Sequence, residues 1–198
     1  MLTNIISHDP NIVEKIKELT EICYPHIEID KLNKNETKRF YRKLVRQKDM
    51  ILQSIHVLFE FQCPIAVYNE LKIQMNDLKL TNVEINYKDL AFDIPDSFND
   101  TVRSQVLSLF KKVKKILIDS DDDGRDLMYI LPQATIIKFN AYLDFLEIYD
   151  MVTCIQKTNV QHTQTKCLVQ DVFDLMCEEF PEFFTKHILE IFLANKEK

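Results

Sequence analysis

The stretch from residue 119 to residue 124 has the spacing that comes closest to a known binding chemistry. Asp119, Asp121, Asp123 and Gly124 match positions 1, 3, 5 and 6 of a calcium-binding loop, where alternate carboxylates converge on a hard cation. The match fails at position 12, where a bidentate glutamate is needed and the sequence has Ile130. We expect a solvated acidic loop, and weak Ca²⁺ or Mg²⁺ binding by the three aspartates is the alternative.

A second group is basic. Residues 31–48 contain eight lysines and arginines and one acidic residue, Glu36, in a chain whose formal net charge is −6. On a helix, residues four apart share one face, so such a row could follow the phosphates of a nucleic acid or meet an acidic protein. The candidate binding residues are Lys38, Arg39, Arg42, Lys43 and Arg46. The alternative is the solvated side of an amphipathic helix.

Catalytic and metal-binding motifs are missing from the sequence. The five cysteines and five histidines lack the paired spacing of a zinc site. There is no nucleophile elbow, no HExxH and no P-loop, and the single glycine disfavours phosphate-binding loops. His56 lies on the shoulder of an apolar stripe and is expected in the core or at its boundary, and His8 is expected on the surface. We therefore predict a protein that is not an enzyme and uses no cofactor.

The carboxyl-terminal part of the chain is rich in phenylalanine. Five large apolar side chains in this part could form a partner-binding surface, because aromatic residues and methionine are enriched in interfaces. They are Phe173, Met176, Phe180, Phe183 and Phe184. The alternative is that they close the core, and periodicity is the same for both.

Apolar periodicity predicts the elements that carry these groups. The chain has 198 residues, 46% of them hydrophobic, and Asp9 and Pro10 match the cap and first residue of a helix. Helical spacing predicts helices over 12–23, about 36–63, 67–78, 99–117, 132–152 and 167–176, and from Pro181. Alternation over residues 83–94 predicts a short extended or β segment.

These elements predict a mainly α fold: a single irregular bundle of about seven helices over residues 1–198, with a short extended segment near 83–94. If the chain has a domain boundary, it is expected at 81–98 or 119–125. The amino terminus lacks a signal sequence and no apolar run reaches the ~20 residues of a membrane span, so we predict a cytoplasmic or nuclear protein. By elimination, the predicted function is a protein–protein interaction module: an adaptor, a complex subunit or a viral protein that binds a host factor. Nucleic-acid binding through the basic helix 34–48 is the alternative, and the oligomeric state stays open.

Overall fold

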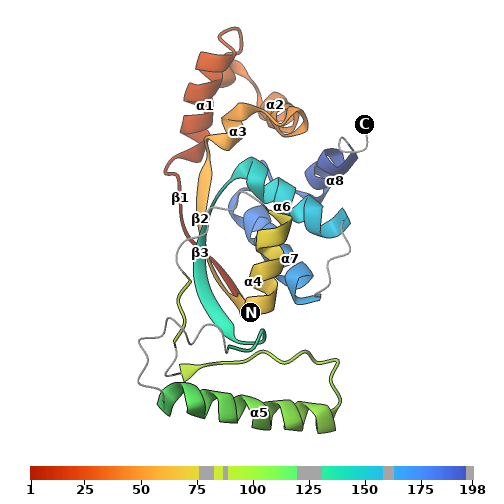
Figure 1. The fold of residues 1–198 in the computed structure, drawn as a ribbon. Helices are drawn as coiled ribbons and strands as arrows, with labels where there is room; N and C mark the ends of the chain where they lie inside the picture. Colours follow the sequence, from red (N-terminus) through yellow and green to blue (C-terminus); the bar gives the residue numbers. More distant parts are fainter. Residues whose placement is uncertain (76–82, 87–88, 120–130, 158–162, 195–198) are drawn as a thin grey trace.

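The centre of the fold is a three-stranded antiparallel sheet with strand order β1-β2-β3 (Figure 1). The computed structural model describes residues 1–75, 83–86, 89–119, 131–157 and 163–194. The strands are β1 (Leu2–His8), β2 (His56–Pro64) and β3 (Ile136–Asp144). Strand β2 pairs with both neighbours, and Phe61 lies between Thr3 and Phe139. Segments from the start, the middle and the last third of the chain therefore meet in one sheet.

Helices flank this sheet on one face and at its ends. Figure 1 shows α4, α6 and α7 on one side of the strands, α1, α2 and α3 at one end, and α5 at the other. Helix α4 contacts β2, α6 contacts β3 and α7 contacts β1. The helices are α1 (Ile12–Cys23), α2 (Lys34–Gln47), α3 (Met50–Gln53), α4 (Ile65–Gln74), α5 (Asp100–Asp119), α6 (Phe145–Lys157), α7 (Thr163–Glu179) and α8 (Lys186–Ala194), with a 3₁₀ turn, η1 (Ile29–Lys31).

The prediction of a mainly α bundle is wrong, because two predicted helices contain strands. The predicted helix over 36–63 is α2, the short α3 and then β2, in which Val57, Phe59, Phe61 and Cys63 are buried and the residues between them are only half-buried. Strand β3 repeats this alternation in the segment predicted as helix from Pro132. Alternate residues of a strand face opposite sides of the sheet, so one apolar set covers one face. The fold is α/β.

The segment predicted as extended lies against β3 without forming a strand of the sheet in its described part. Two isolated antiparallel bridges join this segment to the chain at β3, one from Glu84 to Lys138 and one from Phe92 to Thr135. The Phe92 ring stacks on Phe110 of α5 with centroids 4.4 Å apart. The extended chain thereby connects α5 to the end of the sheet.

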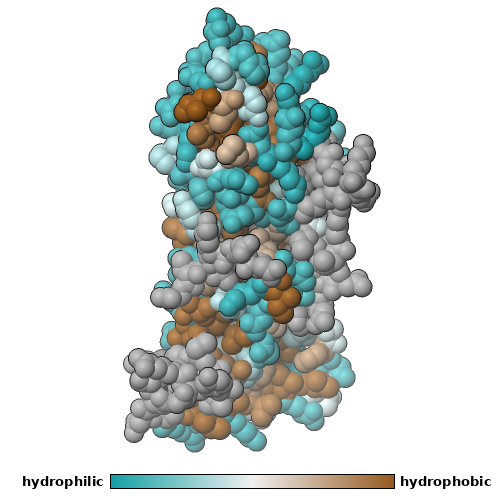
Figure 2. Space-filling view, turned by 45° about the horizontal axis from the view of Figure 1, so that its top comes forward, coloured by the Kyte–Doolittle hydropathy of each residue, from teal (hydrophilic) through white to brown (hydrophobic). Residues whose placement is uncertain are grey.

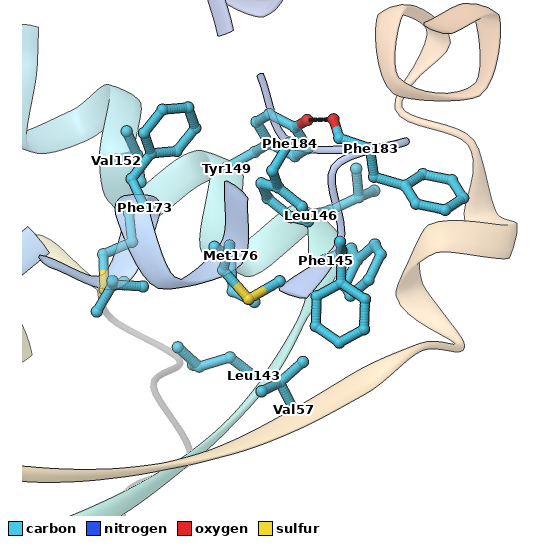
Figure 3. Close-up of a cluster of buried hydrophobic side chains, with 14 of the residues drawn as sticks. Val57, Leu143, Phe145, Leu146, Tyr149, Val152, Phe173, Met176, Phe183 and Phe184 are labelled. Atoms are coloured by element: carbon cyan, nitrogen blue, oxygen red, sulfur yellow. Dashed lines mark hydrogen bonds between the residues drawn. The ribbon is translucent and has the colours of Figure 1, made fainter. Parts of the chain in front are cut away.

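The main core lies between the sheet and its helices. Figure 3 shows Val57 and Leu143 from the strands facing Phe145 and Tyr149 of α6. The Tyr149 ring stacks on Phe184 with centroids 4.6 Å apart, and its hydroxyl donates a hydrogen bond to the Phe183 carbonyl oxygen. Aromatic rings from distant segments therefore close the core behind the sheet.

Helix α5 carries the largest group of exposed apolar side chains in the described part of the chain. Val102, Leu109 and Ile116 are 38%, 57% and 61% exposed, while Phe110 and Leu117 of the same helix are buried. Figure 2 shows hydrophobic residues gathered toward the end of the molecule where α5 lies. None of the described helices is long and apolar enough to cross a membrane.

Candidate functional site

Two aromatic rings stack on the sheet face opposite α4, α6 and α7. His56 begins β2 and Tyr142 lies in β3, and their rings are almost parallel, at 2°, with centroids 4.6 Å apart. Tyr142 is 41% exposed and the His56 side chain is 23% exposed. Within the described residues, no hydrogen bond engages His56 Nε2 or the Tyr142 hydroxyl. The pair therefore offers a planar surface with two polar atoms available to a ligand.

Asp9 lies next to this pair, where β1 ends. The Asp9 N–H donates to the His56 carbonyl oxygen at 3.1 Å, and the His56 N–H donates to Asp9 Oδ2 at 2.9 Å. Lys15 Nζ donates to the same carboxylate oxygen at 2.7 Å. Partial burial raises the pKa of the Asp9 carboxyl, but the hydrogen bonds from Lys15 and the His56 N–H, together with the nearby charges of these residues, lower it below its ordinary value of 3.8. Asp9 is therefore an anion fixed at the edge of the stack.

The geometry corrects the expected start of the first helix. Helix α1 begins at Ile12, and its N-cap is Asn11 with φ of 52°, in the left-handed region and without a side-chain capping bond. Asp9 does not cap the helix, because its carboxylate is taken by Lys15 and by the β2 backbone. A left-handed residue other than glycine is uncommon and marks a constrained junction.

A cavity of about 530 Å³ lies on the other side of the same junction. His8 lines it, with its ring edge-on to Phe180 at 5.2 Å and Nε2 3.4 Å from Glu179. Glu14 and Glu182 also line the cavity, so its rim is acidic. An acidic rim disfavours anionic ligands, and the stack on the sheet is the better candidate site.

The structure does not join the predicted site residues into one site. The basic row of α2 is exposed to solvent along one side of the helix, whereas Phe40, Tyr41 and Leu44 on its other side are buried. The row consists of Lys38, Arg39, Arg42, Lys43 and Arg46.

The carboxyl-terminal apolar group lies in the core. Phe173, Met176, Phe183 and Phe184 are at most 2% exposed and Phe180 is 8% exposed, and Figure 3 shows the first four among the core side chains. These side chains form no surface, and the largest group of exposed apolar side chains among the described residues is on α5.

The acidic-loop candidate lies mostly outside the described residues. Asp119 ends α5, and Asp121 and Asp123 fall in the segment that is not described. No cluster of three or more metal-ligating side chains occurs within the described ranges.

Sequence reasoning missed Asp9, His56 and Tyr142 as a group. The alternation of Val57, Phe59 and Phe61 was the available signal, since it would have placed His56 on the opposite, open face of a strand. Nothing in the linear order indicates that Tyr142 pairs with this strand, because register depends on the fold.

Comparison with solved structures identifies proteins of the same fold. A crystal structure of thymidylate synthase X (ThyX) from Helicobacter pylori with FAD and dUMP matches 96% of this chain and 99% of its own, with a TM-score of 0.74 and 13% identity. A UMP/dUMP methylase, PolB, from Streptomyces cacaoi bound with 5-Br dUMP matches over 98% and 94%, with a TM-score of 0.67 and 14% identity. No protein-family model and no curated protein matches the sequence.

These matches correct the predicted function. The similar structures are a synthase and a methylase, so the prediction of a non-enzymatic adaptor is contradicted. The molecules named with them are FAD, dUMP and 5-Br dUMP, which are small ligands. The predictions of a protein partner and of nucleic-acid binding are contradicted as well. The exclusion of an enzymatic function failed because it relied on the absence of catalytic sequence motifs. Two proteins can share a fold where no such motif is recognisable.

Proposed function

We propose that this protein is an enzyme that binds a pyrimidine nucleotide of the uridylate class and acts on its ring. The observation that carries the proposal is the parallel His56–Tyr142 stack on the open sheet face of a chain whose fold matches ThyX almost end to end. The enzyme would hold the planar ring at the exposed edge of the stack, in contact with the Tyr142 ring and within reach of His56 Nε2. His56 Nε2 would exchange a hydrogen bond or a proton with it, since imidazole is the commonest acid–base group.

The residues of this face fit the ring of a pyrimidine or of a flavin better than they fit phosphate. Stacking is tolerant of ring identity, because every heteroaromatic ring has a π-face. The two lysines beside the stacked face already pair with carboxylates, Lys15 with Asp9 at 2.7 Å and Lys138 with Glu60 at 2.5 Å. We therefore expect the ring to contribute most of the affinity.

FAD is the cofactor named with one of the similar structures. A bound flavin would supply hydride transfer, which amino-acid side chains do not provide. Where the flavin ring takes this face in place of the pyrimidine, Tyr142 and His56 are the described residues that would contact it.

The test is calorimetric titration of the full chain with dUMP, deoxyuridine and FAD. Base stacking on an aromatic side chain contributes about 1–3 kcal/mol, so Tyr142→Ala should weaken binding about 5- to 150-fold. Tyr142→Phe keeps the ring and should bind within about 3-fold of the wild type. Phe98→Ala is the matched control, because Phe98 is also an exposed ring, at 40%, and lies outside the site.

Absence of binding of all three molecules at millimolar concentration would refute the proposal. An equal loss of affinity in Tyr142→Ala and Phe98→Ala would refute the placement of the ring on Tyr142.

We further propose, from the sequence, that residues 1–198 form one domain and that the protein is cytoplasmic or nuclear. The main core cluster, with members from Ile12 to Leu189, supports the first point, and the small cluster of Leu90, Leu117 and Leu131 is linked to it by Ile65 and Ile85, which pack against both. Fluorescence microscopy of the tagged protein tests the second.

A further inference from the structure

Asp9 and His56 are held together by two opposed hydrogen bonds, each donated by a backbone N–H. In a regular antiparallel pair, two facing residues exchange both N–H to carbonyl hydrogen bonds. Here the Asp9 N–H donates to the His56 carbonyl oxygen, but the His56 N–H donates to the Asp9 side chain. The Asp9 carboxylate takes the place of the Asp9 carbonyl as the acceptor for the His56 N–H. This bond holds the carboxylate beside the His56 imidazole.

The imidazole is fixed on its other side by Tyr142. The two rings lie at 2° to each other, which restricts rotation of the His56 ring. In this orientation Nδ1 is 3.8 Å from Asp9 Oδ2. Because Nδ1 and Nε2 point in divergent directions, Nε2 is directed away from the carboxylate.

We infer that Asp9 is the positioning residue of this site: it keeps the His56 Nδ1–H directed toward its carboxylate and leaves Nε2 as the ligand-facing atom. The inference extends the proposed function, since it assigns the atom that would meet the ligand. An anion beside one ring nitrogen favours the tautomer with the proton on that nitrogen. Nε2 is then the acceptor, which is the form that a general base requires.

The other charged groups near His56 are engaged elsewhere. Asp144 pairs with His56 in the β2–β3 register, and its Oδ1 accepts a hydrogen bond from the Glu147 N–H at 2.8 Å. Lys15 is bonded to Asp9 itself. Among the described residues, Asp9 is therefore the carboxylate whose position favours one tautomer of the His56 ring.

The first test needs no ligand. Two-bond ¹H–¹⁵N correlation spectra at about pH 8, where an imidazole is neutral, report which ring nitrogen carries the proton. In the wild type we expect the His56 proton on Nδ1. Asp9→Asn keeps an oxygen that can accept from the His56 N–H but removes the charge, so the proton should move to Nε2. An unchanged tautomer in Asp9→Asn would overturn the inference.

Two further variants separate this effect from a general loss of structure. Glu179→Gln is the matched control, because Glu179 pairs with His8 on the other side of the junction and its loss should leave the His56 signals unchanged. Lys15→Met keeps Asp9 and removes its competing donor, so the proton should stay on Nδ1. Movement of the proton to Nε2 in Lys15→Met would also count against the inference.

Titration with dUMP connects the inference to the proposed function. We expect Asp9→Asn to weaken dUMP binding about 2- to 10-fold, the effect of one hydrogen bond, and Glu179→Gln to leave it unchanged. If dUMP shifts no signal in the wild type, the proposed function fails while the tautomer result still decides the role of Asp9. If dUMP binds equally to wild type and Asp9→Asn, the positioning role fails while the proposed function stands.

Discussion

Removal of the buried Tyr149 hydroxyl tests the hydrogen bond that joins helix α6 to Phe183, in the segment after α7. Tyr149 is fully buried and its hydroxyl donates to the Phe183 carbonyl oxygen (Figure 3). Burial, with a smaller effect of Cys177, raises the pKa of Tyr149 above its ordinary value of 10.0, so the phenol stays protonated as a donor. Tyr149→Phe keeps the ring that stacks on Phe184 and removes only this donor.

The expected loss of stability follows from the partner that is left behind. A buried acceptor that loses its hydrogen bond costs about 1–3 kcal/mol. For a protein of this length, each kcal/mol lowers Tm by about 2–4 °C, so Tm should fall by about 2–12 °C.

Thermal unfolding followed by circular dichroism measures this difference. Tyr142→Phe is the matched control, because its hydroxyl is on an exposed residue and has no hydrogen bond in the described structure. Its stability should change by less than about 0.5 kcal/mol. A Tm change in Tyr149→Phe no larger than that in Tyr142→Phe would contradict the assigned role of the Phe183 carbonyl.

Three other measurements test the packing and the charges. Burial raises the pKa of the Cys63 thiol to about 12, so maleimide should label exposed Cys167 in the native protein and label Cys63 only in denaturant, as read by mass spectrometry. Because the pKa of folded Asp9 is below 3.8, its contribution to stability is present above that pH and is lost as pH falls through the folded pKa. The Tm difference between wild type and Asp9→Asn should therefore shrink from about pH 5 to about pH 2, and a constant difference would contradict the assignment. Phe173→Ala should lower the free energy of unfolding by about 3–5 kcal/mol in a urea titration, and a loss below about 1 kcal/mol would show that Phe173 is not a core residue.

Several helices could be predicted from local sequence. Apolar spacing located α1 and most of α5 and α7, because a helix that packs on one side repeats its contacts every three to four residues. Asn99, just before α5, has a residue type that favours a helix start, and its Oδ1 accepts a hydrogen bond from the Val102 N–H at 2.9 Å. Apolar spacing and capping residues are local features of the sequence, so they are the same in any fold that buries one side of the helix.

The strands were missed because their neighbours hide them. Helices α2 and α3 run directly into β2, and β3 runs directly into α6, so apolar residues continue across each boundary. A short apolar run fits a strand and a buried helix equally well. The single glycine is also little for a sheet built from hairpins with tight turns, which need it. This sheet needs no such hairpin, because long segments separate its three strands.

The amino-acid sequence alone specifies the side-chain chemistry: a carboxylate at Asp9, an imidazole at His56 and a phenol at Tyr142. It also determined the alternation that puts Val57 and Phe59 on one face of β2 and His56 on the other. The proximity of these three groups depends on the tertiary fold, since pairing of β2 with β1 and β3 joins residues from distant parts of the chain. Register is fixed by burial of the apolar face against the helices, and that face is completed by residues that no local pattern connects.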